Sequence, residues 1–187
     1  MAEEANINIM RIININKQRS ESKSPLCEKC VRLNCLINMY CSQKLKIFLD
    51  SQKLFFSYKK AQSVFREGNS VSGVYFIHNG KIKIYNTGKK SKQNIVRLVT
   101  SGEMFGLTGF DEKQYFVSAS TLEDSFLCFF EKEIFIKTLK ENPEFAWQLL
   151  DLFAHELSNI EIQHKNSNQL NNKEKITGVL LMLKDKF

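Results

Sequence analysis

The stretch Phe65–Gly88, FREGNSVSGVYFIHNGKIKIYNTG, decides the fold class of this chain. It holds two short runs typical of strands, Val74–His78 and Lys81–Tyr85, with Asn79-Gly80 between them. In the second run isoleucines alternate with lysines, so that one face of a strand is apolar and the other is charged. Asn-Gly between two such runs is a strong signal for a tight turn between antiparallel strands. The stretch therefore predicts a β-hairpin inside a β-rich domain.

Short runs of the same kind lie on both sides of this hairpin. Ser57–Phe65 precedes it, and Asn94–Val99, Tyr115–Thr121 and Ser125–Phe130 follow it, with turn-forming glycines between the runs. About six or seven short strands at this spacing are typical of a sandwich or roll, and the 15 phenylalanines suit such an interior. We therefore expect a mainly β fold with added helices, in which residues 51–132 form an antiparallel β-roll of the double-stranded β-helix type.

Two helices are predicted after the roll, over residues 133–170. Asn142-Pro143 is a favourable start for the second, because Asn caps helices and Pro suits the first turn. The apolar residues of this helix recur at alternating steps of four and three, the repeat of a coiled-coil seam, at Ala146, Leu150, Phe153, Leu157 and Ile160. We therefore expect a dimerisation helix that pairs with its copy in a homodimer. The alternative is a helix that packs on its own roll, with Trp147, Leu149 and Leu152 as its second face.

The two ends of the chain differ from its middle. Residues 1–24 are polar apart from an Ile/Asn alternation, and we expect a flexible arm there. Residues 171–187 begin another amphipathic helix. No apolar run approaches the roughly 20 residues that a membrane span requires, and the start MAEEANINIM lacks the basic region of a signal peptide. These observations predict a cytoplasmic protein without a membrane partner.

Four of the five cysteines lie close together in the sequence. They belong to residues 25–50, a segment that also carries a short helical stripe, and they are Cys27, Cys30, Cys35 and Cys41. The fifth, Cys128, lies in the last predicted strand. In a reducing cytoplasm this distribution indicates metal or redox chemistry rather than a disulfide framework.

The sequence lacks the parts of a catalytic site. The three histidines, His78, His155 and His164, are scattered, and none of them lies in a recognisable nucleophile motif. No Gly-rich loop of the phosphate-binding type occurs. We therefore expect that the chain is not an enzyme.

Several motifs follow one another in a recognisable order. They are FREGN (Phe65–Asn69), VYFI with NGKIKIY (Val74–Tyr85), SGEMFG (Ser101–Gly106) and TLEDS (Thr121–Ser125). In wording and spacing they resemble motifs of the Crp/Fnr family of bacterial transcription regulators, and the resemblance covers roughly Cys27 to the end. It implies a roll like a cyclic nucleotide-binding domain, followed by a dimerisation helix. It also identifies residues 171–187 as similar to the first helix of a winged helix-turn-helix domain that is truncated here.

The resemblance also bears on the effector. In the nucleotide-binding members a Glu after the second Gly of the turn binds the ribose, and an Arg clamps the phosphate with its two-pronged guanidinium. Here Leu107 follows Gly106, and Lys113-Gln114-Tyr115 lies where that Arg would stand. A cyclic nucleotide is therefore not expected. A different effector at the same place stays open, with Gly102, Glu103, Gly106, Leu107, Lys113 and Gln114 as its candidate residues.

The cysteines resemble those of the oxygen-sensing Fnr branch, in which N-terminal cysteines and one strand cysteine hold a [4Fe–4S] cluster. The ligands implied for this chain are Cys27, Cys30, Cys41 and Cys128, with Cys35 as the alternative third N-terminal ligand. Two alternatives stay open. The four N-terminal cysteines could bind zinc, or no metal binds and Cys128 is an ordinary core residue.

The function implied by the resemblance is that of a transcription regulator that responds to redox state or oxygen. Its homodimer would bind palindromic DNA in the full-length protein, and RNA polymerase would be a further partner. A net charge of +7 agrees with a nucleic-acid partner. Because a recognition helix and wing are missing from the 187 residues, the alternative is a ligand-binding or interaction module without DNA binding of its own.

Overall fold

The computed structural model describes residues 20–21, 25–88, 92–108, 113–169 and 171–186. It divides into two compact units, residues 1–141 and residues 142–187. The predicted arm, residues 1–24, lies outside the described residues except for Ser20–Glu21, which form strand β1 and pair with β2.

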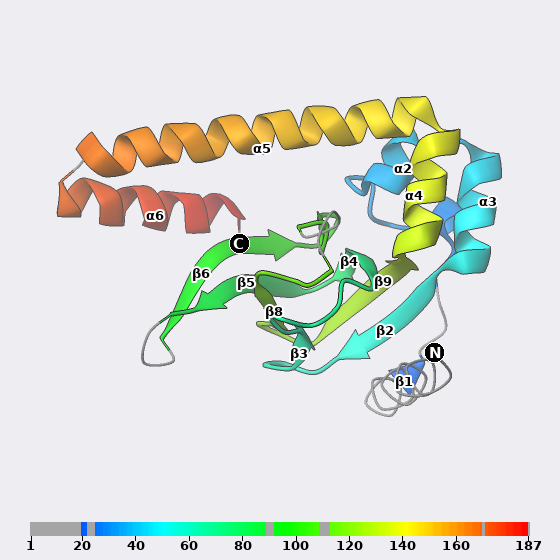
Figure 1. Ribbon diagram of the computed structural model, residues 1–187, viewed down its shortest axis with the longest axis horizontal. Coiled ribbons are helices and arrows are strands. Elements are labelled where there is room, and N and C mark those ends of the chain that lie inside the picture. Colours follow the sequence, from blue (N-terminus) through cyan, green and yellow to red (C-terminus); the bar gives the residue numbers. More distant parts are fainter. Residues whose placement is uncertain (1–19, 22–24, 89–91, 109–112, 170, 187) are drawn as a thin grey trace. The chain divides into compact units, whose positions relative to one another are not determined.

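The described strands of the first unit form the two sheets of an antiparallel roll (Figure 1). One sheet has five strands in the order β1-β2-β9-β4-β7, and the other has four in the order β3-β8-β5-β6. The strands that follow β1 are β2 (Leu54–Tyr58), β3 (Ser63–Phe65), β4 (Gly73–Asn79), β5 (Lys81–Thr87), β6 (Gln93–Thr100), β7 (Met104–Phe105), β8 (Ser118–Thr121) and β9 (Ser125–Glu131). The predicted mainly β fold with an antiparallel roll is confirmed.

The pairing predicted at Asn79-Gly80 is wrong, although both strands form. β4 pairs with β9 on one side and β7 on the other, whereas β5 pairs with β6 and β8. Because both edges of β4 are occupied, the turn carries the chain from one sheet to the other. Gly80 has a φ of 120°, and a Cβ there would lie 2.2 Å from Ser125 Oγ, so the turn requires glycine. The hairpin of this region instead joins β5 to β6, and Gly88 N–H donates to Lys92 O beside its turn.

Aromatic rings fill the space between the two sheets. Phe65 and Tyr115 stack with their ring centroids 3.9 Å apart, and Tyr75 stacks on Phe105 at 5.2 Å. Burial of one such side chain stabilises a fold by about 1.5–3 kcal/mol. The roll therefore has a hydrophobic core of its own.

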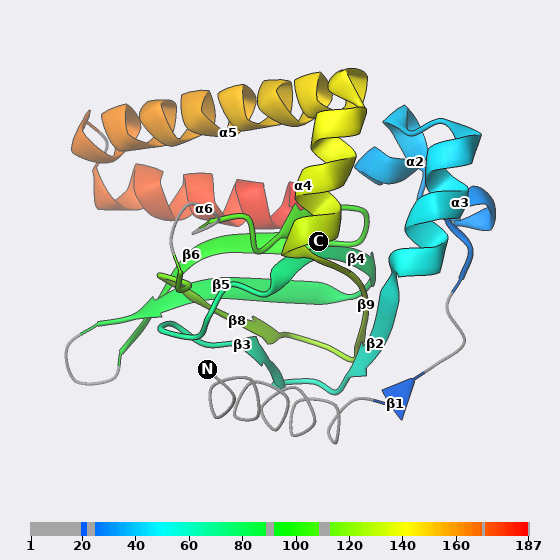
Figure 2. The ribbon, with the colours of Figure 1, turned by 45° about the vertical axis from the view of Figure 1, so that its right-hand side comes forward.

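Helices cover one end of the roll. η1 (Cys27–Lys29), α2 (Leu36–Tyr40) and α3 (Gln43–Gln52) precede β2, and α4 (Lys132–Glu141) follows β9 directly. α3 begins after Ser42, whose Oγ accepts a hydrogen bond from Leu45 N–H at 3.3 Å. α4 contacts β4 and β9 (Figure 2), and its Phe135 ring lies 6.3 Å from the ring of Phe76.

The second unit consists of two helices, α5 (Pro143–Gln169) and α6 (Asn172–Lys186). α6 starts with a reciprocal cap. Asn171 Oδ1 accepts from the N–H groups of Lys173 and Glu174, and Glu174 Oε2 accepts from Asn171 N–H. Among the described helices, none has both the length and the apolar character needed to cross a bilayer.

Candidate metal centre

Four cysteine side chains converge on one small cavity in the first unit. The cavity has a volume of about 20 Å³, room for about one water molecule. Its lining includes Cys27, Cys30, Cys35 and Cys128. Phe76, Ile77 and Phe130 of the five-stranded sheet add apolar surface to the same lining. The cavity therefore joins thiols from two segments that are far apart in the sequence.

Strand alternation explains the position of Cys128. Its neighbours Leu127 and Phe129 are buried in the core between the sheets. Because successive side chains of a strand point to opposite faces, Cys128 points to the other face of the five-stranded sheet. There it lies between Phe55 of β2 and Phe76 of β4 in the strand register, and the segment of η1 covers it.

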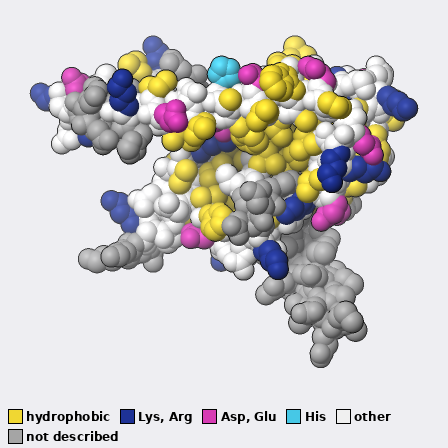
Figure 3. Space-filling view, turned by 45° about the horizontal axis from the view of Figure 1, so that its top comes forward, with side chains coloured by type: hydrophobic (Ala, Val, Ile, Leu, Met, Phe, Trp, Pro, Cys, Tyr) yellow, Lys and Arg dark blue, Asp and Glu magenta, His cyan; other side chains and the backbone are white. Residues whose placement is uncertain are grey.

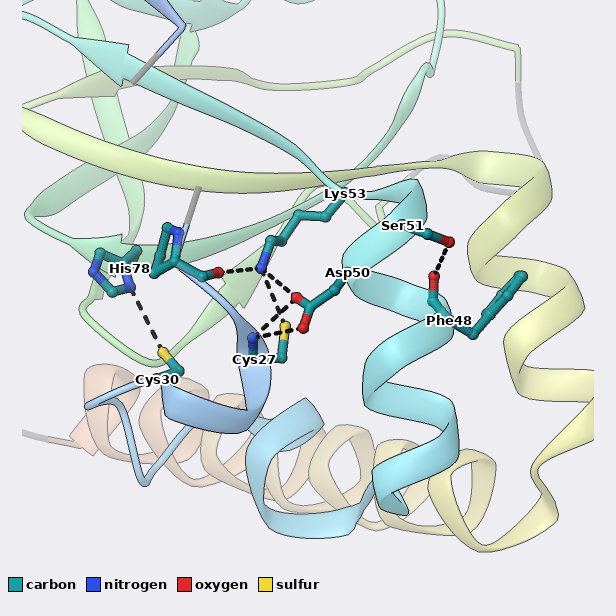
Figure 4. Close-up of polar contacts among 8 residues, drawn as sticks. Cys27, Cys30, Phe48, Asp50, Ser51, Lys53 and His78 are labelled. Atoms are coloured by element: carbon teal, nitrogen blue, oxygen red, sulfur yellow. Dashed lines mark hydrogen bonds and ion pairs between the residues drawn. The ribbon is translucent and has the colours of Figure 1, made fainter. Parts of the chain in front are cut away.

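A buried ion pair holds η1 in place (Figure 4). Cys27 N–H donates to both carboxylate oxygens of Asp50, at 2.9 Å each. Lys53 Nζ donates to Asp50 Oδ1 at 2.6 Å, to Cys27 Sγ at 3.3 Å and to Pro25 O. Only 1% of the Lys53 side chain is exposed, so its charge lies inside the site rather than in solvent. Burial opposes ionisation of Asp50, but the hydrogen bonds from Lys53 and Cys27 outweigh it and lower the pKa of the carboxyl.

Burial keeps most of these thiols protonated. It raises the pKa of Cys27 and of Cys128 to about 12, and it raises the pKa of Cys35 as well. A thiolate, the form that binds metal, therefore needs positive charge from a bound cation at this site. Lys53 already supplies one such charge, which acts to lower the pKa of both Cys27 and Cys128 and so offsets part of the effect of burial.

Replacing Lys53 by methionine is expected to destabilise the chain by about 3 kcal/mol, because the Asp50 carboxylate, only 12% exposed, loses its partner. The double variant Asp50→Asn/Lys53→Met should recover part of that loss, because no charge is left unpaired. Urea denaturation of the metal-free wild type, of the single variants Asp50→Asn and Lys53→Met, and of the double variant measures this coupling. Strictly additive effects of the two substitutions would contradict the ion pair.

His78 extends the site on the side of β4. The register between β4 and β9 shifts between Ile77 and Asn79, and such a bulge re-aims the side chain within it. His78 Nδ1 lies 3.6 Å from Cys30 Sγ. Burial, followed by the charges of Arg32 and Lys53, lowers the pKa of His78, so its ring is neutral at pH 7.

Arg32 fastens the loop of Cys30 to the same strand. Its Nε donates to His78 O at 2.6 Å, and its second terminal nitrogen donates to Asn79 Oδ1 at 2.7 Å. The sequence did not indicate Arg32, His78, Asp50 or Lys53 as parts of this site. Apart from the contact between Asp50 and Lys53, which spans three residues, their partners lie 23 to 48 residues away, so no local motif connects them to the cysteines.

Cys41, the first choice for the third N-terminal ligand, does not line the cavity, whereas the alternative Cys35 does. α2 explains the difference, because Cys35 precedes this helix and Cys41 follows it. Cys41 is itself buried, and burial raises its pKa to about 12. Within the described ranges, no three His, Cys, Asp or Glu side chains are close enough to hold a single metal ion.

The six residues predicted around an effector lie in the turns on either side of β7 and in the stretch before β8. Glu103 Oε2 accepts from Thr100 N–H at 2.6 Å, so this carboxylate serves the turn before β7. Gly106 lies against Tyr75, and Gln114 bridges to Ser70. None of Gly102, Glu103, Gly106, Leu107, Lys113 and Gln114 lines the cysteine cavity. The interior of the roll next to Gly106 contains the stacked rings of Tyr75 and Phe105.

Because of Tyr115, the stability of this region should fall at alkaline pH. Burial raises its pKa from 10.0 to about 12, and its hydroxyl donates to Gly73 O at 3.1 Å. The unfolded chain therefore ionises first, so this contribution is complete below pH 10 and is lost as the pH rises through about 12. Between those values the wild type should lose about 2 kcal/mol more than Tyr115→Phe. Urea denaturation of both proteins at pH 8 and pH 11.5 measures the difference, and parallel losses would contradict the assignment.

The five predicted seam positions lie along α5. Leu150, Phe153, Leu157 and Ile160 are 58%, 40%, 59% and 62% exposed, and Ala146 is half-buried. Figure 3 shows hydrophobic side chains at the surface along this helix. Exposed leucine and isoleucine at coiled-coil spacing are typical of a helix that pairs with another helix.

Comparison with known proteins gives one family match and several relatives. The family model described as the cyclic nucleotide-binding domain matches residues 55–142. The transcriptional activator protein Anr of Pseudomonas aeruginosa is 27% identical over 99 residues, which cover 53% of this chain and 41% of Anr. The fumarate and nitrate reduction regulatory protein of Vibrio cholerae is 23% identical over 129 residues, which cover 69% of this chain and 52% of that protein.

A solved structure shows the same fold. The sensor domain of the transcriptional regulator DNR from Pseudomonas aeruginosa has a TM-score of 0.62 at 19% identity, over 78% of this chain and 93% of that domain. This chain spans about half the length of the curated relatives that it matches.

Proposed function

Because residues 55–142 are a cyclic nucleotide-binding domain and the chain is a relative of the Crp/Fnr transcription regulators, we propose that it is the sensor and dimerisation part of such a regulator, responsive to oxygen or redox state. The observation that carries the redox part is the convergence of Cys27, Cys30, Cys35 and Cys128 on one cavity. A cytoplasmic location, in which thiols stay reduced, goes with this proposal.

The donor set suits an iron–sulfur cluster better than a single zinc ion. Four thiolates are the ligands of a [4Fe–4S] cluster, which would supply oxygen-sensitive redox chemistry when bound. Such a cluster would be held by Cys27, Cys30, Cys35 and Cys128, which share one cavity, whereas among the described residues no three His, Cys, Asp or Glu side chains form a single-ion site.

The residues around the cavity have distinct roles in this proposal. Cys128 is fixed by β9, whereas Cys27, Cys30 and Cys35 belong to short segments that must move outward to widen a cavity of about 20 Å³. Lys53 supplies positive charge beside the thiolates, and Asp50 holds both Lys53 and the backbone of Cys27.

The cysteine site and α5 are connected by the chain itself. β9, which carries Cys128, continues directly into α4, and α4 is followed by α5. We infer that the state of the cysteine site changes the pairing of α5 with a second copy of the chain. The dimer would present two DNA-binding heads to palindromic DNA in the full-length protein, with RNA polymerase as a further partner.

Purification without oxygen tests the sensor directly. The chain should be brown, with a broad visible absorption band, about four irons and four sulfides per chain, and loss of colour in air. A colourless protein that contains stoichiometric zinc would indicate a zinc site in place of the cluster. Colourless, metal-free protein after anaerobic reconstitution with iron and sulfide would overturn the redox part and leave the fold unaffected.

A further inference from the structure

A second cavity lies on the four-stranded sheet of the roll and shares no lining residue with the cysteine cavity. Its volume is about 350 Å³, and most of its lining is polar. Its residues come from β3, β5, β6, β8, the turn before β3 and the positions that directly follow β3 and β8. At this size it can hold a small metabolite rather than a single ion.

The strand register explains why polar groups collect here. Ser63 of β3 pairs with Ser120 of β8, and Ser120 pairs with Lys83 of β5, so the three side chains form one row on the same face. The adjacent Ile82 and Ile84 are buried in the core, so this row faces outward. Ala61 also lines the cavity, with a φ of 63°, a strained conformation that is concentrated at functional sites.

The charged side chains described in the lining of this groove are all positive. Lys60, Arg66 and Lys83 line it, and no carboxylate of the described residues does. Of the acidic residues close in sequence to the lining, Asp124 pairs with Lys59 at 2.8 Å and Glu123 pairs with Lys81 at 3.5 Å. Glu67, which follows Arg66, does not line the cavity.

Lys83 is held by neutral groups. Its Nζ donates to Gln93 Oε1 at 2.7 Å and lies 4.9 Å from the centroid of the Tyr85 ring. Neither contact cancels its charge, and in the described part of the chain no carboxylate pairs with it. The ammonium is thus oriented in the groove while its charge stays available to an anion.

We propose that this groove binds a small phosphorylated metabolite that carries at least two phosphoryl groups, such as a nucleoside diphosphate. Three cations match the charge of a diphosphate, and the hydroxyls of Ser63 and Ser120 can donate to its remaining oxygens. A single phosphate would leave part of this positive charge uncompensated. The site does not involve the cysteines, so it would add a metabolic input to the proposed sensor.

Calorimetric titration of the full chain tests this proposal. The probes are inorganic pyrophosphate, ADP, orthophosphate and a Glu-rich peptide, in the presence of a chelator. We expect pyrophosphate and ADP to bind with micromolar to submillimolar affinity, at least tenfold more tightly than orthophosphate. Lys83→Glu should weaken the binding of pyrophosphate at least tenfold. Lys44→Glu, which makes the same change of charge at an exposed position of α3, should leave it within twofold.

Three results would overturn the proposal. They are no binding of pyrophosphate or ADP at millimolar concentration, an equal loss in Lys83→Glu and Lys44→Glu, and tighter binding of the peptide than of either phosphate compound. The last would make the groove a protein-docking surface. If Lys83→Glu does not fold by circular dichroism, the exposed Arg66→Glu carries the same comparison with Lys44→Glu.

Discussion

Cys128→Ser is expected to lower the iron and sulfide content of anaerobically prepared protein at least about tenfold. Loss of residues that merely support a metal ligand already costs about 10–100-fold in affinity, and Cys128 is the one thiol that a strand of the roll holds in the cavity. The fold should persist, because serine differs from cysteine by a single atom and Cys128 points away from the core between the sheets. Iron and sulfide analysis, together with visible absorption, measures the effect.

The matched control for this prediction is Cys41→Ser. Cys41 is also buried, and burial also raises its pKa to about 12, yet it does not line the cavity. Its replacement should leave the iron content unchanged, whereas Cys35→Ser should lower it as Cys128→Ser does. Full loss in Cys41→Ser with full retention in Cys35→Ser would restore the ligand set first expected from the sequence.

Leu157→Glu is expected to weaken self-association of the chain at least about 100-fold. The substitution places a charge in the middle of an apolar seam, and burial of an unpaired carboxylate costs several kcal/mol, of which each 1.4 kcal/mol is about tenfold in affinity. Sedimentation velocity over a concentration series measures the change. Since Leu157 is 59% exposed in the chain itself, the stability of the monomer should change little.

Asn159→Glu is the control for the seam. It adds the same charge to α5, but at an exposed position on a different side of the helix. Self-association should stay within about twofold of the wild type, since an exposed charge contributes little. A monomeric wild type, or equal weakening in both variants, would favour the alternative in which α5 does not pair with its copy.

The roll could be predicted because its signals are local. Alternating side chains and turn residues identify a strand within a few positions, and β4, β5 and β9 form where these signals are strongest. The partner of each strand is not local. β7 and β9 occupy the edges of β4, and both come later in the sequence than the Asn79-Gly80 turn, which by itself is equally compatible with a hairpin.

The candidate site was predictable in part. The resemblance selected Cys27, Cys30 and Cys128 as ligands, but it did not decide whether Cys35 or Cys41 is the third N-terminal ligand. The choice depends on α2, which separates the two by about 9 Å along its axis at about 1.5 Å per residue. Lys53 gave no signal at all, because a lysine three residues after an aspartate, at the end of a polar helix, usually belongs to a solvated surface. Its burial follows from the way η1 covers it, and a short Cys-containing turn cannot be recognised as a cover from sequence alone.

The Asp50–Lys53 pair has a consequence for how tightly the site could hold its cofactor. The pair holds η1 against the roll through oxygen and nitrogen atoms of the protein, without any contribution from a metal. Loading would therefore not have to fold the cysteine segment from a disordered chain, and little of the binding free energy would be consumed in ordering it. The segment would still have to move outward to widen the cavity, but after loss of the cofactor it would stay structured enough to be loaded again.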